Sequence, residues 1–147
     1  MSQYSRMIPP PAPTPSGLRW HPLTECLFTE PLRFGAMLLP TVQGIYAIMA
    51  PDDTWTPRKF RPLYFGEAGN LKTRVTWSHE KSAEWVREAR TSPIYVSFYL
   101  TLGKSEEERR TMEEKFIAHY CPPCNVKSNP LSIFAAMLAN NHYGKLS

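Results

Sequence analysis

The sequence predicts an α/β fold, a small three-stranded antiparallel sheet flanked by helices, with its elements in the order β-β-α-β-α-α. Three observations favour this fold. Apolar runs of strand length occur at 44–49, 62–66 and 94–100, helical periodicity follows the second and third runs, and turn-forming residues separate the elements. With 147 residues, of which 42% are hydrophobic, the chain is long enough to bury the core of one domain.

The first two strands, 44–49 and 62–66, are expected to pair antiparallel, although the loop that joins them is long for a hairpin. That loop is rich in proline and charged residues, which indicates an exposed connection. The run at 94–100 is the strongest strand of the chain, because aromatic and β-branched residues fill it.

Two long helices are predicted beside the strands. The first begins after the N-cap Asn70 and runs to about Arg90, with apolar residues recurring on one face. The second begins at Ser105, which forms a capping box with Glu108, and runs to about Tyr120. Prolines at 122–123 end this helix, and 131–139 is expected to form a last short helix.

The two ends of the chain differ from its centre. Residues 1–17 are rich in proline and are expected to form a disordered tail. Residues 18–42 have no regular period but carry many large apolar groups, so we expect an N-terminal extension packed on the domain. The domain itself spans 43–126, and 127–147 form a C-terminal helix and tail.

Charge and hydropathy limit the classes of function. The net charge of +4 and the isoelectric point of about 9.1 suit an anionic partner without demanding one. No apolar stretch has the length of a membrane span, and no secretory signal is visible at the start. These features predict a cytoplasmic protein that does not contact a membrane.

The three cysteines, Cys26, Cys121 and Cys124, do not indicate a disulfide framework, because their number is odd. Cys121 and Cys124 have the spacing of a redox pair or of half a zinc site. A zinc site would need two more ligands, and Cys26, His119 and His142 are the candidates. Free thiols in a loop stiffened by proline are the favoured interpretation, and a zinc or redox protein is the alternative.

Glu113 is the most informative residue of the second helix. At about 100° per residue it lies within the apolar stripe of that helix, whereas Glu114 points away. A carboxylate that faces inward is costly unless it is paired, protonated or bound to a metal. The helical period leaves two interpretations open, namely an ion pair with Arg74 or a metal ligand or general base.

Five further residues are candidates for chemistry. Tyr46 and Tyr64 lie on neighbouring strands, where each alone would be read as core packing. Arg74 is placed to reach a phosphate, unless it is a solvated helix charge. His79 is a candidate base or ligand, as His119 also is, although a lone histidine is more often a surface or satisfied residue.

Together these residues resemble the GIY-YIG nucleases. Gly44-Ile45-Tyr46 and Tyr64-Phe65-Gly66 are similar to the two tripeptides that name the family, and Arg74 follows the second tyrosine by ten residues. Glu113 and Asn125, twelve residues apart, resemble the metal-binding glutamate of the family and its terminal asparagine. The resemblance covers roughly 43–125, and it selects Glu113 over Glu114 independently of the helical period.

The resemblance implies a metal-dependent endonuclease that hydrolyses phosphodiester bonds in DNA by a one-metal mechanism. Glu113 would hold Mg²⁺ or Mn²⁺, and Arg74 would stabilise the negative charge that grows on the phosphate oxygens. Tyr46 would be the general base for the attacking water, its phenol made more acidic by the site. Tyr64 would orient water or phosphate, and Asn125 would brace the site.

The chain departs from the pattern of the family at three places. The segment between the two tyrosines is longer than usual, which indicates an inserted loop at 50–61. Glu67 stands where related enzymes often carry a lysine. The position expected for a second histidine or tyrosine is Ser78, so a small distortion of the helix would be needed to bring His79 into the site.

These departures favour an alternative function, a catalytically inactive module on the same fold that binds nucleic acid or a protein. In either case Lys72, Arg74, Arg87 and Arg90 are candidate nucleic-acid contacts. Trp77 and Trp85 are candidates for stacking on bases, although Trp85 lies on the apolar helical face and is expected in the core. DNA is expected over RNA, and a protein partner is compatible with the sequence. The choice among single-stranded, duplex and branched substrates is not encoded in any motif.

Overall fold

The computed structural model describes residues 17–125. The proline-rich residues 1–16 and the helix expected at 131–139 lie outside this range. Within it the chain forms, in order, β1 (Leu18–Arg19), β2 (Leu27–Phe28), β3 (Leu32–Arg33), β4 (Gly44–Pro51), β5 (Phe60–Ala68), α2 (Leu71–Arg74), α3 (Ser82–Ala89), β6 (Tyr95–Leu100), α4 (Glu106–Tyr120) and the short 3₁₀ helix η1 (Pro123–Asn125).

The described residues form a four-stranded antiparallel sheet in the order β3-β6-β4-β5 and a separate two-stranded ribbon of β1 and β2. The expected strands are present as β4, β5 and β6, but the prediction of a three-stranded sheet is wrong. The additional strands are two residues long each, and a segment that short has no period that a sequence can show. β5 lies at one edge of the sheet, paired along one side with β4.

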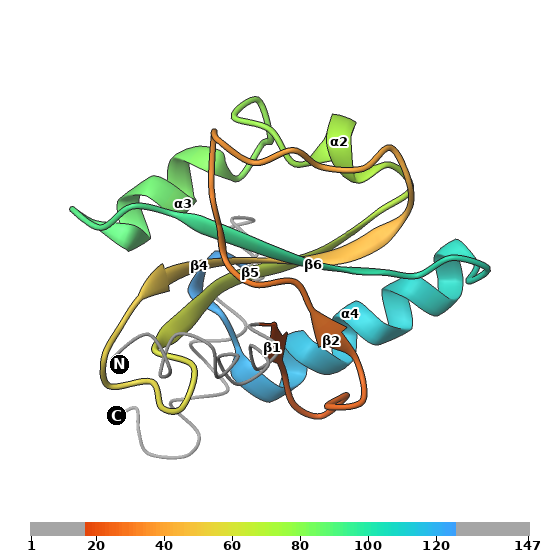
Figure 1. Ribbon diagram of the computed structural model, residues 1–147, viewed down its shortest axis with the longest axis horizontal. Helices are drawn as coiled ribbons and strands as arrows, with labels where there is room; N and C mark the ends of the chain where they lie inside the picture. The colour runs from red at the N-terminus through yellow and green to blue at the C-terminus, as the bar shows by residue number, and fades with distance from the viewer. Residues whose placement is uncertain (1–16, 126–147) are drawn as a thin grey trace, which may run out of the picture.

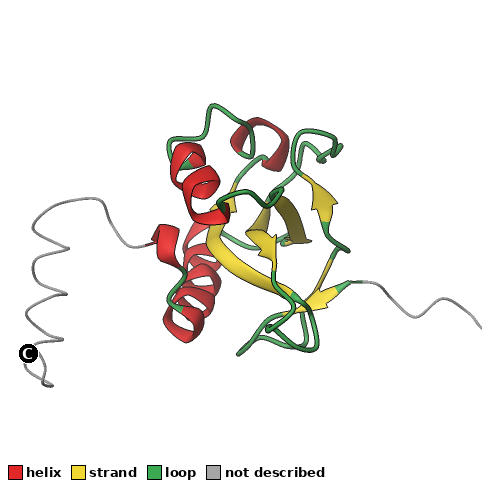
Figure 2. Cartoon of the chain, turned by 90° about the vertical axis from the view of Figure 1, so that its left-hand side faces the viewer, coloured by secondary structure: helices red, strands yellow, loops and turns green. Residues whose placement is uncertain are grey.

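The sheet lies between α2 and α3 on one side and α4 with the β1-β2 ribbon on the other (Figure 1), and an apolar cluster fills each side. Alternate side chains of β4 enter opposite layers, because successive residues of a strand point to opposite faces. Tyr46 and Ile48 pack toward α2 and α3, whereas Ile45 and Ala47 pack toward α4 and the β1-β2 ribbon. Figure 2 shows the helices above and below the strands in a view turned by 90°.

The single helix expected from Asn70 to about Arg90 is wrong, since the chain forms two shorter helices with turns between them. Asn70 is the predicted N-cap and accepts a hydrogen bond from the Thr73 amide, but α2 ends after four residues. Thr76 then bonds the hydroxyl and the amide of Ser78. Hydroxyl groups that bond nearby backbone in this way compete with the helix, and the apolar period does not reveal them.

The capping box predicted for α4 is confirmed, with both hydrogen bonds between Ser105 and Glu108 present. The helix ends at Cys121, which adopts a left-handed conformation with φ of 47°. α4 packs against β5 and β4, so its inward face lies directly beneath the edge of the sheet.

The segment before β4 packs against both layers. Trp20 and Phe28 are buried on the α4 side of the sheet, and Phe34 is buried on the α3 side. Along the part of the chain that the structure describes, no helix is long and apolar enough to cross a membrane.

Candidate active site at the edge of β5

The phenol of Tyr46 crosses β5 at Gly66, which is its partner in the strand register. A Cβ atom placed on Gly66 would overlap Cζ and Oη of Tyr46. Glycine is therefore needed here for space and not for turn geometry. As a result the Tyr46 hydroxyl reaches over the outermost strand of the sheet.

His79 holds the Tyr46 hydroxyl, with Nε2 and Oη 2.9 Å apart. The backbone N–H of Lys81 donates to Nδ1 of His79 at 3.0 Å, so Nδ1 carries no proton. In the neutral ring Nε2 then bears the proton, and the Nε2–H group donates a hydrogen bond to the Tyr46 hydroxyl oxygen. Burial, followed by the nearby Arg74, lowers the pKa of His79 to about 4, so the ring is neutral at pH 7.

The structure thus brings His79 to the site, although its sequence position is one residue later than the family pattern. The end of α2 at Arg74 and the turns at 75–79 supply the distortion that this requires. Ser78, at the expected position, is exposed.

Tyr64 lies beside this pair. Its ring centroid is 6.1 Å from that of Tyr46 and 5.5 Å from that of His79. Burial raises the pKa of Tyr64 to about 12, and the Glu113 carboxylate adds to the rise. Burial, Tyr64 and Glu113 also raise the pKa of Tyr46 above its usual value, and Arg74 only partly opposes them. The expectation that the site makes the Tyr46 phenol more acidic is wrong for the protein alone.

Arg74 forms a two-point ion pair with Glu80, with N···O distances of 2.8 and 2.7 Å. The guanidinium lowers the pKa of Glu80 to about 2, and the pair raises the pKa of Arg74. The interpretation in which Arg74 pairs with Glu113 is therefore wrong. Arg74 still acts on both Tyr46 and Tyr64, whose pKa values its charge lowers.

Glu113 faces the cluster from α4 and is partly buried, whereas Glu114 is exposed. Burial and the neighbouring Glu67 carboxylate raise the pKa of Glu113 to about 7, against the opposing effect of a hydrogen bond from the Glu67 backbone. Among the residues that the structure describes, none forms an ion pair with Glu113. A cation that is held by one carboxylate and otherwise by water and phosphate fits this environment.

Glu67 is itself neutralised by an arginine. Its carboxylate is 2.9 Å from Nε of the buried Arg109 and 3.8 Å from Nε of Arg110. Glu67, Arg74 and Arg109 line a polar cleft of about 520 Å³ between α2 and the start of α4. The negative charge that Glu67 brings to this part of the fold is thus balanced by the positive charge of Arg109.

Asn125 braces β5 from its outer side. Its Oδ1 accepts the Phe65 N–H at 2.8 Å, and its Nδ2 donates to the Phe65 carbonyl at 2.9 Å. The side-chain amide therefore takes the place of a neighbouring strand at an edge where both backbone groups would lack partners.

The remaining candidates lie outside this cluster. Lys72 is exposed on α2, and Arg87 and Arg90 are exposed at the far end of α3. The charge of Arg87 slightly lowers the pKa of Cys124, whereas burial raises that pKa by more. No contact within 17–125 joins Arg87 or Arg90 to Glu113.

The zinc alternative has little support in the described residues. Cys121 is exposed and Cys124 is buried, and neither is in a disulfide. Within 17–125 no three histidine, cysteine or acidic side chains come together as a metal site, and the candidate ligand His142 lies outside that range.

Two residues of the site, Glu80 and Arg109, escaped the sequence analysis, and Gly66 was named only as part of a tripeptide. Glu80 had no signal, because its ion pair with Arg74 depends on the turns that follow α2. Arg109 had one, since it precedes Glu113 by four residues and therefore shares its inward helical face.

No protein-family model and no curated protein matches the chain. Solved structures that resemble it include three point mutants of the GIY-YIG N-terminal endonuclease domain of UvrC from Thermotoga maritima, each bound to its catalytic divalent cation. They are 22–23% identical to this chain, cover 61% of it and 89% of their own length, and have a TM-score of 0.43.

Proposed function

We propose that this chain is a metal-dependent endonuclease that hydrolyses phosphodiester bonds in DNA. The observation that carries the proposal is the environment of Glu113, a partly buried carboxylate without an ion-pair partner among the described residues. The carboxylate acts on the phenols of Tyr46 and Tyr64, and Arg74 acts on the same two phenols. A partly buried carboxylate of this kind has no evident structural use, whereas beside a phosphate-binding arginine it serves a cation.

Glu113 is the residue that holds the divalent ion, Mg²⁺ or Mn²⁺. Hard cations of this kind prefer oxygen ligands, and Mg²⁺ commonly binds through one or two carboxylates while the substrate phosphate and water complete its shell. When bound, the ion supplies Lewis-acid stabilisation of the phosphate oxygens.

The protein residues perform the rest of the reaction. Tyr46, as phenolate, accepts the proton of the attacking water, and the N–H of His79 stabilises the negative oxygen by donating to it. Arg74 stabilises the charge on the phosphate, which requires that it exchange part of its bond to Glu80 for the substrate. Tyr64 orients water or phosphate, and Asn125 keeps β5 in place.

The domain that carries this activity is 43–126, with 18–42 packed on it. Arg74 is the basic group of the cleft that offers a contact to an anionic backbone, once it exchanges part of its bond to Glu80. Glu67 does not oppose this binding, because Arg109 already neutralises it.

The test is cleavage of end-labelled single-stranded and duplex DNA in Mg²⁺, Mn²⁺ or EDTA. We expect the wild type to cut in either metal but not in EDTA, and Glu113→Gln to lose at least about a hundredfold in rate. Glu114→Gln is the matched control, because it removes the same charge from the exposed side of α4.

Two results would count against the proposal. If the folded wild type cuts neither form of DNA in any metal, the proposal of an active enzyme fails, and the departures at Glu67 and Ser78 favour a binding module. If Glu113→Gln and Glu114→Gln lose the same activity, the ion is not held at Glu113.

A further inference from the structure

A second, mainly apolar pocket of about 340 Å³ lies between the segment 34–39 and the end of α2. Phe34, Leu39, Val75 and Trp77 form its walls, and Lys72 is the charged group that lines it. Trp77 is 52% exposed, and its ring lies 4.3 Å from that of Phe34, centroid to centroid. Leu38, which is 93% exposed, lines the same pocket, so Trp77 belongs to an apolar surface patch of the kind that marks an interaction site.

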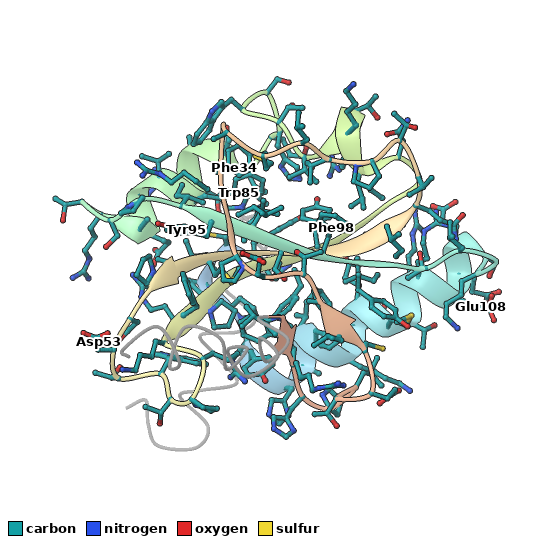
Figure 3. All side chains as sticks on the ribbon, viewed as in Figure 1. Phe34, Asp53, Trp85, Tyr95, Phe98 and Glu108 are labelled. Atoms are coloured by element: carbon teal, nitrogen blue, oxygen red, sulfur yellow. The ribbon has the colours of Figure 1, made fainter. Side chains whose placement is uncertain are left out.

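The pocket is continuous with the candidate active site through packed aromatic rings. Phe34 contacts Trp85, with centroids 5.7 Å apart, and the two are labelled side by side in Figure 3. Trp85 in turn contacts Tyr64 at 5.5 Å and His79 at 4.5 Å. Trp77 also lies on the short segment between Arg74 and His79. The pocket and Arg74 are therefore carried by the same segment of the chain, since Val75, Thr76 and Trp77 line the pocket directly after Arg74.

We propose that the Trp77 pocket binds an unpaired nucleobase of a single-stranded segment in the substrate. This inference rests on the proposed function and names its substrate class. A nucleobase is flat and apolar on its faces, and it stacks on aromatic side chains whatever its identity. Lys72 lines the same pocket and matches the phosphate that follows the base, since no carboxylate is among the residues that line it.

A fully paired duplex cannot use this pocket, because its bases are stacked inside the helix. The pocket thus selects a substrate with at least one base free to leave the stack, such as a single strand, a gap or a flap.

The test measures binding by fluorescence anisotropy in EDTA, so that no strand is cut. The probes are a labelled oligothymidylate of about 12 nucleotides, the same strand with abasic sites throughout, and a blunt duplex. The proteins are the full chain, Trp77→Leu, Trp77→Phe and the control Leu102→Ala, which changes an exposed apolar side chain outside the pocket. Leucine keeps an apolar contact with Phe34 but has no stacking face, and phenylalanine keeps both.

We expect Trp77→Leu to weaken binding of the oligothymidylate by about tenfold, the usual contribution of one stacked base. Trp77→Phe should lose much less, and Leu102→Ala should lose nothing. Binding of the abasic strand and of the duplex should be the same in all four proteins, since neither offers a free base.

Tryptophan fluorescence provides a second measurement of the same binding. Of the four tryptophans, Trp20 and Trp85 are fully buried and Trp55 is partly exposed outside the pocket, so quenching by oligothymidylate should be weaker in Trp77→Phe than in the wild type. If Trp77→Leu binds oligothymidylate as tightly as the wild type, the inference is overturned and the pocket serves a different ligand, such as an apolar side chain of a protein. If the wild type binds no DNA at all, the proposed function fails together with the inference.

Discussion

At the scale of single residues, the site depends on which atoms carry protons. The Lys81 amide fixes the ring of His79 so that its Nε2–H donates to Tyr46. The positive charge of Arg74 also lowers the pKa of Tyr46. Both stabilise a phenolate, while burial opposes one. The balance predicts a base that is mostly protonated at neutral pH.

The rate of cleavage should therefore rise with pH. Because the pKa of Tyr46 lies above its usual value, the phenolate fraction grows about tenfold for each pH unit below that pKa. His79, with a pKa of about 4, stays neutral above pH 6 and adds no acidic limb there. The measurement is the single-turnover rate in saturating Mg²⁺ from pH 6 to about pH 9.

Two variants separate Tyr46 from other groups that ionise. Tyr46→Phe should lower the rate by about 10² to 10⁴ and flatten its pH dependence. His79→Gln should retain more activity than His79→Ala, because an amide N–H still donates to the phenol. A rate that is independent of pH in the wild type would contradict the role of Tyr46.

Glu113 gives a prediction that does not depend on cleavage. Its pKa rises from the ordinary 4.5 to about 7 on folding, so the folded state binds the extra proton between these values. The contribution of Glu113 to stability is present below pH 4.5 and is lost as the pH rises to 7, by about 3 kcal/mol at most. Glu113→Gln should therefore be more stable than the wild type at pH 8, and equally stable at pH 4, in metal-free urea titrations.

If Glu113 holds the ion as proposed, adding Mg²⁺ at pH 8 should stabilise the folded wild type but not the variant and so reverse this order. If the difference between the two proteins is the same at pH 4 and pH 8, Glu113 is not a carboxylate with a raised pKa.

At the scale of elements, β5 is the strand on which the site is built. It supplies Tyr64, the space above Gly66, and the backbone of Glu67, while its outer edge is satisfied by Asn125. Asn125→Ala would leave the Phe65 N–H and C=O without partners, at a cost of about 2–3 kcal/mol in unfolding free energy.

Urea unfolding of Asn125→Ala checks this cost, and Asn70→Ala is the comparison, since it removes the single cap of the short α2 for about 1 kcal/mol. Equal losses in the two variants would show that Asn125 acts only as a local cap and does not complete the sheet.

The elements also differ in how far the sequence could predict them. β4, β6 and α4 were predictable because their apolar patterns are strong and local, and the capping box of Ser105 fixes where α4 begins. The inward position of Glu113 followed from the same helical period. The break between α2 and α3 was not predictable, because it depends on the hydroxyl of Thr76 bonding to Ser78. The contact of His79 with Tyr46 depends on that break. The sequence could therefore predict only that His79 would reach the site if the helix were distorted.

At the scale of the whole molecule, the segment before β4 completes both layers around the sheet. Trp20 meets Phe65 and Tyr120 edge-on, at centroid distances of 5.4 and 5.5 Å, and Arg58 lies 4.4 Å above its ring. Phe65 is the residue whose backbone Asn125 holds. The extension is therefore coupled to the strand that carries the site, and its lack of period in the sequence reflects irregular backbone with large side chains turned inward.

Trp20 should accordingly be one of the most costly positions to truncate. It is fully buried, and Trp20→Ala should lower the free energy of unfolding by about 3–5 kcal/mol, as large core truncations do. Trp20→Phe should cost less, because it keeps the edge contact with Phe65 and removes an indole N–H that has no hydrogen-bond partner among the described residues. Leu102→Ala, at 66% exposure, should change stability by less than about 0.5 kcal/mol. Urea titrations of the full chain measure all three, and a Trp20→Ala protein as stable as Leu102→Ala would mean that 43–126 folds without the extension.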